Sequence, residues 1–192
     1  FIALLGKNGS GKSTIAKLTN ALLIPTNGIV ITNGYPTSEE EFHLEIRKST
    51  GMVFQNPDNQ IFSSTVDEEV AFGLENIGYE QEKIEGRVTE VLDLVGMGKY
   101  ANRDTSMLSG GQKQRINIAS ILAMKPKCIV LDEATAMLDP IGRKTILQLV
   151  RKLNREENVT IIHITHHMSE AILADRVIIV DDGRVILDDT PE

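Results

Sequence analysis

Near its start the chain reads Gly6-Lys7-Asn8-Gly9-Ser10-Gly11-Lys12-Ser13, which is a glycine, four further residues and then Gly-Lys-Ser. The glycines allow successive backbone N–H groups to point at one anion, and a helix that begins near Lys12 adds its positive end. In this pattern the lysine reaches the outer phosphates of a nucleotide and the serine hydroxyl ligates magnesium. The residues expected to contact the phosphates are Gly6, Lys7, Asn8, Gly9, Ser10, Gly11, Lys12, Ser13 and Thr14.

The residues on either side of this loop fit the same interpretation. An apolar run, Phe1 to Leu5, precedes the loop, and the spacing of apolar residues from Lys12 to Leu23 is typical of a helix. The order strand, glycine loop, helix is the context that a phosphate site requires, so it disfavours an ordinary glycine turn. Because the chain opens inside the apolar run without a methionine, we expect further residues upstream.

Further apolar runs alternate with helical patterns, which predicts an α/β fold with a mostly parallel sheet. The strands expected in that sheet are Phe1 to Leu5, Gly51 to Phe54, Cys128 to Leu131, Thr160 to Thr165 and Val177 to Val180. A short strand over Ile29 to Ile31, followed by a turn at Asn33-Gly34, predicts a small antiparallel β region. Asp139 and Pro140 supply the cap and first residue of a later helix.

The middle of the chain carries mostly helix signals. Thr65 with Glu68 fits a capping box, a helix is expected from Gln81 to Val95 before Gly96, and Ser109 with Gln112 fits a second box. We therefore predict one domain over residues 1–192, with a nucleotide-binding core at 1–55 and 125–192 and an inserted helical subdomain at 56–124.

Two adjacent carboxylates, Asp132 and Glu133, end the apolar run at Leu131. They are expected at the carboxyl edge of a parallel strand, where ligands bind in such sheets. Asp132 can hold magnesium and Glu133 can polarise the water that attacks the γ-phosphate. Acidic residues also cap helices, but the phosphate loop elsewhere in the chain favours the chemical interpretation.

Composition limits the class of protein. The 192 residues include 27 acidic and 20 basic ones, for a formal net charge of −7, which argues against a nucleic-acid partner. No apolar run approaches the ~20 residues that cross a bilayer, and no signal sequence is visible. This predicts a cytoplasmic location.

The segment Leu108-Ser109-Gly110-Gly111-Gln112 opens the helix that continues to Met124. Together with the phosphate loop and the acidic pair, this segment makes the whole chain resemble the nucleotide-binding subunit of an ATP-binding cassette (ABC) transporter, whose signature sequence is identical to it. The resemblance implies the phosphate-loop NTPase fold of the ABC type, with ATP and Mg²⁺ as ligands, and it implies ATP hydrolysis. The stretch Leu108 to Gln112 is called the signature segment.

Further roles are implied by the resemblance alone. Gln55 is the loop glutamine that touches magnesium and the membrane partner, Asp139 lies at the seam between two subunits, and His166 is the switch histidine at the γ-phosphate. Of the neighbouring histidines, His163 is interpreted as structural and His167 as surface variation. The catalytic set is Glu133, His166, Lys12 and Gln55; the metal set is Ser13, Gln55 and Asp132; and the nucleotide also meets Ser109, Gly110, Gly111, Gln112 and Asp139.

Within the family, the runs Val53 to Phe62 and Asp132 to Pro140 are similar to those of energy-coupling factor (ECF) importers, which take up vitamins and metal ions. That similarity implies a second ABC ATPase subunit, identical or related, and two membrane partners, a transmembrane coupling subunit and a substrate-binding subunit. It implies a peripheral position at the cytoplasmic face of the cell membrane. The family's adenine-stacking aromatic residue lies well upstream of the phosphate loop, so it is not expected among Phe1 to Leu5.

Three alternatives remain. The chain could serve another ABC importer, or be an ABC ATPase without membrane partners, although the marks of that second group, a long coiled coil or a tandem cassette, are not seen. A small-molecule kinase or binding module shares only the phosphate loop and has no use for Ser109 or for Glu133 beside Asp132.

Overall fold

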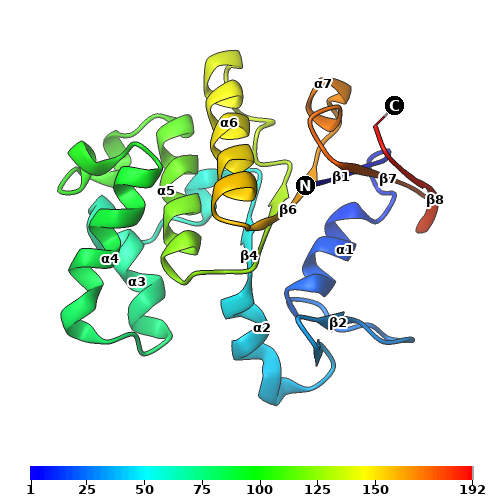
Figure 1. Cartoon of the computed structure of the whole chain (residues 1–192), viewed down its shortest axis with the longest axis horizontal. Coiled ribbons are helices and arrows are strands. Elements are labelled where there is room, and N and C mark those ends of the chain that lie inside the picture. Colours follow the sequence, from blue (N-terminus) through cyan, green and yellow to red (C-terminus); the bar gives the residue numbers. More distant parts are fainter. Residues whose placement is uncertain (192) are drawn as a thin grey trace.

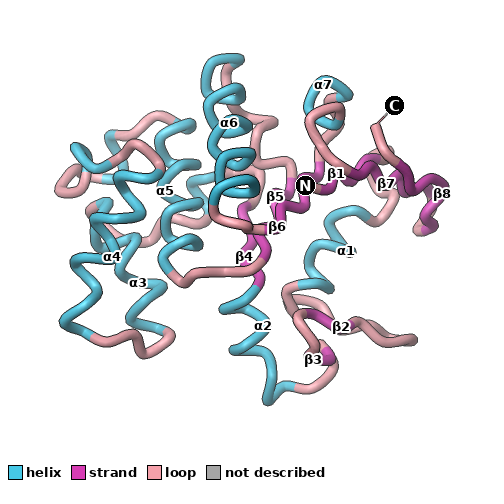
Figure 2. The backbone as a smooth tube through the Cα atoms, viewed as in Figure 1, coloured by secondary structure: helices cyan, strands magenta, loops and turns pink. Residues whose placement is uncertain are grey.

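The computed structural model describes residues 1–191, and its centre is one twisted sheet. Within that range the sheet has six strands in the order β4-β5-β6-β1-β7-β8. The pairs from β4 to β7 are parallel, and β8 returns antiparallel to β7. Figure 2 shows these strands in magenta, between α6 and α7 on one side and α1 on the other. The bounds are β1 Ile2–Leu5, β4 Thr50–Val53, β5 Cys128–Asp132, β6 Thr160–Ile164, β7 Arg176–Asp181 and β8 Arg184–Asp189. The predicted mostly parallel α/β sheet is confirmed.

Helices cover both faces of the sheet. In Figure 1, α6 and α7 lie on one side and α1 on the other, while α3, α4 and α5 gather beyond β4. The helices are α1 Lys12–Thr19, α2 His43–Ser49, α3 Val66–Asn76, α4 Gln81–Leu94, α5 Gly110–Ala123, α6 Pro140–Glu156 and α7 Met168–Ala171. Short 3₁₀ turns are η1 Glu40–Phe42, η2 Pro57–Asn59, η3 Gly98–Tyr100 and η4 Thr105–Met107. Among the described residues, none of these helices is both long and apolar enough to span a bilayer.

The strand register decides where the loops emerge. Ile164, the last residue of β6, is the partner of both Leu4 on β1 and Asp132 at the end of β5. Because these strands run parallel, the loops that follow them leave the sheet at the same edge. The residues after the three strands are therefore neighbours in space, although they lie far apart in the sequence.

Helix caps follow the sequence signals closely. Both predicted capping boxes are present, at Thr65 with Glu68 and at Ser109 with Gln112. Asp139 caps α6 by accepting a hydrogen bond of 2.7 Å from the Gly142 amide, with Pro140 in the first turn. The predicted helix starts are confirmed because each rests on contacts within one turn.

Two elements have a boundary that was wrong by more than one residue. Helix α1 ends at Thr19 rather than Leu23, because Ala21 adopts a φ of 55° that no helix can continue through. The first strand of the two-stranded antiparallel sheet is β2, Ile31–Thr32, rather than 29–31, and it pairs with β3, Tyr35–Pro36.

The helices α3, α4 and α5 lie together in Figure 1, but they do not have a separate core. One buried cluster contains Val70 and Val88 from α3 and α4 as well as Ile129 and Ile161 from the sheet. Helix α5 packs against α3, α4, β4 and α6, so it joins the two groups of elements. The division into a core at 1–55 and 125–192 and a subdomain at 56–124 stays a prediction.

The contact between β4 and α5 is tight at Gly51. A Cβ atom added there would overlap the side chain of Ile121. We expect Gly51→Ala to lower the free energy of unfolding by about 1–3 kcal/mol, as overpacking of a dense core does. Urea denaturation measures this change.

Gly86→Ala is the matched control. Gly86 lies in α4 with nothing within 4 Å of an added Cβ, so alanine should raise stability by up to about 1 kcal/mol. A Gly51→Ala chain as stable as the wild type would contradict the packing described here.

Candidate active site

The phosphate loop connects β1 to α1. Gly6 has a φ of 152° and Gly11 one of 108°, and an added Cβ at Gly6 would overlap the Val180 carbonyl oxygen. Only glycine fits both positions comfortably. The loop folds around Lys12, whose Nζ donates to the carbonyl oxygens of Gly6 at 2.9 Å and Lys7 at 2.8 Å. Lys12 is thus held by the concave loop that was predicted to receive phosphates.

The end of β5 meets the start of α1. The Ser13 hydroxyl donates to Asp132 Oδ1 at 2.9 Å across 119 positions of sequence. Burial raises the pKa of Asp132 above its usual value, although the hydrogen bond from Ser13 opposes this. A hydroxyl and a carboxylate in contact beside a phosphate loop form an oxygen-rich corner of the kind that Mg²⁺ prefers.

Glu133 and His166 leave the same edge of the sheet and touch. Glu133 Oε1 lies 2.6 Å from His166 Nε2, and the Glu133 amide donates to the Ile164 carbonyl oxygen at 3.1 Å. Glu133 adopts a φ of 52°, which is uncommon for a residue with a side chain. The strained turn points the carboxylate toward the histidine rather than along the strand.

A cavity of about 490 Å³ brings several of the predicted residues together. Its volume falls in the range of about 300–1,000 Å³ that small-molecule sites occupy. The residues that line it are Asn8, Gly9, Gly11, Lys12, Ser13, Thr14, Gln55 and Glu133. Gln55, which was assigned only through the family resemblance, therefore shares a cavity with the phosphate loop.

A second groove, of about 400 Å³, contains another group of the predicted residues, whereas Gly6, Lys7, Ser10, Asp132 and His166 line neither cavity. Ser109, Gly110, Gly111, Gln112 and Asp139 all line it, together with Met137 and Ile141, which are 60% and 77% exposed. No residue of the phosphate loop lines this groove. Within one chain, the signature segment and Asp139 thus lie together but apart from the first cavity.

Helix α5 carries a buried polar residue that no sequence motif indicated. The Gln114 side chain is fully buried, and its Nε2 donates to the carbonyl oxygens of Phe54 at 2.9 Å and Ala134 at 2.8 Å. Those carbonyl groups stand next to Gln55 and Glu133. In the sequence Gln114 stands between two other polar residues of the helix, Gln112 and Asn117. Nothing in the local sequence therefore distinguishes it from a solvent-exposed polar residue.

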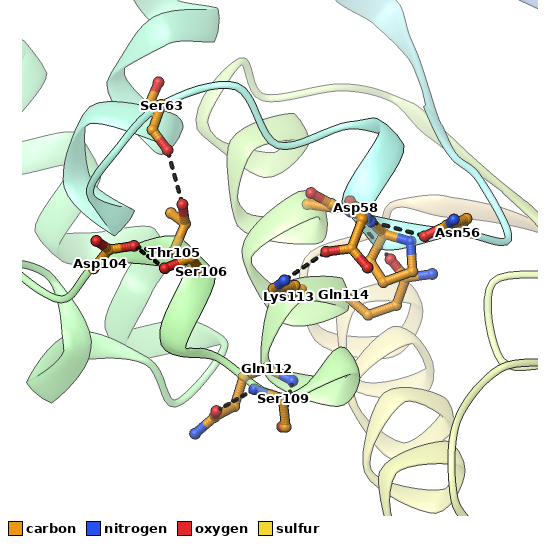
Figure 3. Close-up of polar contacts among 12 residues, drawn as sticks. Asn56, Asp58, Ser63, Asp104, Thr105, Ser106, Ser109, Gln112, Lys113 and Gln114 are labelled. Atoms are coloured by element: carbon orange, nitrogen blue, oxygen red, sulfur yellow. Dashed lines mark hydrogen bonds and ion pairs between the residues drawn. The ribbon is translucent and has the colours of Figure 1, made fainter.

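The Gln55 loop has a second attachment to α5 through an ion pair. Lys113 Nζ lies 2.5 Å from Asp58 Oδ1, and the Asp58 amide donates to the Asn56 side chain at 3.0 Å. Figure 3 shows Lys113 and Gln114 one turn beyond the Ser109–Gln112 cap, facing the loop that holds Asn56 and Asp58. The helix that starts at the signature segment therefore holds the loop on both sides of Gln55.

A phosphate loop between a strand and a helix, a serine–aspartate contact and a nearby carboxylate define a nucleotide-binding phosphate-loop protein. The family model described as "ABC transporter" matches residues 1–136. The chain belongs to this family, and the resemblance seen in the sequence is confirmed. It is accordingly a nucleotide-binding ATPase of the ABC type.

Relatives and solved structures agree with this assignment. The chain is 54% identical over 191 residues to "Energy-coupling factor transporter ATP-binding protein EcfA1" of Clostridioides difficile. The alignment covers 100% of this chain and 69% of that protein. A protein of the same name from Caldanaerobacter subterraneus is 56% identical over 192 residues, with the same coverage.

Among solved structures, cbiO1 from Clostridium perfringens, part of the ABC transporter complex cbiONQ, superposes with a TM-score of 0.91 at 38% identity, over 99% of this chain and 76% of that one. The ATP-binding cassette MJ0796, a dimer in a post-hydrolysis state bound to ADP and Pi, superposes with a TM-score of 0.87 at 33% identity. This superposition covers 100% of this chain and 85% of that one.

Proposed function

We propose that the chain is the ATP-hydrolysing subunit of an ECF-type ABC importer that takes up a vitamin or a metal ion. The energy-coupling factor names of the relatives support the transporter type. The observation that carries the chemistry is the contact between Ser13 and Asp132, at 2.9 Å, beside a cavity lined by Lys12, Gln55 and Glu133. It joins a phosphate loop to the carboxylates of a distant strand.

Each side chain has a role in this proposal. The loop amides and Lys12 bind the ATP phosphates, and the lysine charge stabilises the transferred phosphoryl group. Glu133 orients the attacking water. The His166 ring, with its Nε2 2.6 Å from Glu133 Oε1, holds the Glu133 carboxylate in place. Electrostatic and positioning effects of this kind supply most of the catalysis in phosphoryl transfer.

The residues also fit a magnesium ion. Ser13, Asp132 and Gln55 offer hydroxyl, carboxylate and amide oxygens, and the first two already touch. Mg²⁺ in nucleotide sites takes one or two protein ligands of this type besides phosphate oxygens. When bound, the ion neutralises charge on the phosphates.

The two separate cavities favour a pair of subunits. The groove with Ser109 and Asp139 faces the phosphate loop of a second ABC subunit, so that two chains enclose two ATP molecules. MJ0796 is a dimer of this family with ADP and Pi bound. The transmembrane coupling subunit and the substrate-binding subunit complete the complex, and the ATPase pair lies at the cytoplasmic face of the membrane. The similar protein cbiO1 is part of the ABC transporter complex cbiONQ.

The test compares the wild type with Ser109→Arg. The wild-type chain should release phosphate from ATP and Mg²⁺ with no acceptor substrate and form dimers in ATP. Ser109→Arg should still bind ATP but sediment as a monomer, because a bulky cation fills the groove that receives the second subunit.

Thr89→Arg is the control, since it adds the same charge at an exposed position of α4, away from both cavities. Normal dimers of Ser109→Arg would count against the signature assignment. Transfer of phosphate to an acceptor, with none to water, would favour the kinase alternative. Purification without membrane subunits would favour an ABC ATPase outside transport.

A further inference from the structure

A buried carboxylate on α7 has no part in the mechanism above. Glu170 is 1% exposed, and its Oε2 accepts hydrogen bonds from Thr165 at 2.6 Å and from His163 at 2.7 Å. The Thr135 hydroxyl lies 3.1 Å from the same oxygen. Three donors from two different loops and a strand therefore converge on one carboxylate.

The charge of Glu170 determines the direction of these bonds. Burial by itself raises the pKa of Glu170, but the hydrogen bonds from His163, Thr165 and Thr135 outweigh it and bring the pKa to about 2. The group is ionised at neutral pH and can only accept. Each partner must donate, so His163 carries a hydrogen on Nε2. Arg143 on α6 adds a positive charge, with its Nε 3.6 Å from Glu170 Oε1.

The donors stand beside the catalytic pair in sequence. Thr165 directly precedes His166, and its hydroxyl also accepts a hydrogen bond of 3.0 Å from the His167 amide, so it engages the chain on both sides of His166. Thr135 follows Glu133 by two positions. The loops that carry Glu133 and His166 are therefore connected through Glu170 as well as through their own contact of 2.6 Å.

We infer that Glu170 is a positioning residue for ATP hydrolysis, which holds the Glu133 and His166 loops in register through Thr135 and Thr165. The inference rests on the proposed function, because it assigns a task to residues around the water that Glu133 orients. Glu170 is buried and does not line the cavity of the phosphate loop, so it acts through other residues. A buried ionised group that served only to anchor α7 would need no hydroxyl donors from both catalytic loops.

The first test uses isosteric variants of Thr165. Thr165→Val removes the hydroxyl and keeps the shape, whereas Thr165→Ser keeps the hydroxyl. We expect Thr165→Val to lower kcat by about tenfold or more, since displacing a catalytic group by about 1 Å can cost about 10²-fold. The KM for ATP and the bound ATP per chain should stay within about twofold of the wild type, and Thr165→Ser should behave like the wild type.

The second test asks whether the effect passes through Glu133. In a Glu133→Gln background, Thr165→Val should lower the residual phosphate release little further, measured with enzyme in excess over ATP. Thr135→Val and Thr135→Ser repeat the comparison if Thr165→Val does not fold. Equal kcat in the valine and serine variants, or full additivity with Glu133→Gln, would overturn the inference alone. A wild-type chain that releases no phosphate would overturn the proposed function and this inference with it.

Discussion

A Glu133→Gln chain should bind ATP as tightly as the wild type and release phosphate about 10²- to 10⁴-fold more slowly, the usual contribution of a general base. The glutamine side chain has the size of glutamate and can still form a hydrogen bond with His166, whose Nε2 lies 2.6 Å from Glu133 Oε1 in the wild type. It cannot accept a proton from water. Binding should be unaffected because the phosphates are held by the loop and Lys12, which keep their own contacts.

Phosphate release and equilibrium binding of a fluorescent ATP analogue measure the two quantities separately. Glu157→Gln is the control, because that carboxylate is exposed beyond the end of α6. Equal turnover in Glu133→Gln and the wild type would remove Glu133 from the mechanism and leave the ABC family assignment untouched.

Lys12→Ala should affect nucleotide binding, the step before hydrolysis, and weaken the affinity for ATP by about 10- to 150-fold. Lys12 is 4% exposed and is held by two carbonyl oxygens of the loop, so its charge is already aimed into the concave face. Hydrogen bonds to a charged group contribute about 1.5–3 kcal/mol, which converts to that loss of affinity. Turnover should fall with it.

Isothermal titration with ATP and Mg²⁺ measures the change, and Lys144→Ala on α6 is the control for loss of one positive charge outside the cavity. Thermal unfolding checks that the loop itself survives. Unaltered affinity in a folded Lys12→Ala chain would place the nucleotide elsewhere.

The features that could be predicted from the sequence are those encoded within one turn or one strand. The glycine pattern before Lys12, the caps at Thr65, Ser109 and Asp139, and the apolar strand before Asp132 are local signals, and the structure places them as expected. The end of α1 was missed because the residue with a left-handed backbone conformation after the helix is Ala21, whereas a glycine there would have signalled the helix end.

The residues that connect these motifs could not be predicted from sequence patterns. Gln114 bonds a carbonyl group 60 positions away, and Thr135 meets Glu170 across 35 positions. A glutamine in a helix and a glutamate in a short surface-like segment are ordinarily solvated, so their burial depends on which strands become neighbours. The functional roles of Gln55, Asp139 and His166 were likewise assigned through family resemblance, because a single polar residue carries no spacing signal for a role in a nucleotide site.

Helix α5 is fastened to the sheet at two points. Near its beginning Gln114 is bonded to Phe54 and Ala134, and near its end Ile121 presses on Gly51 with no space to spare. Contacts at two separate positions along the helix oppose its rotation and sliding relative to β4. We therefore expect a displacement of Ser109 by a second subunit to be transmitted along α5 to β4 and to the Gln55 loop.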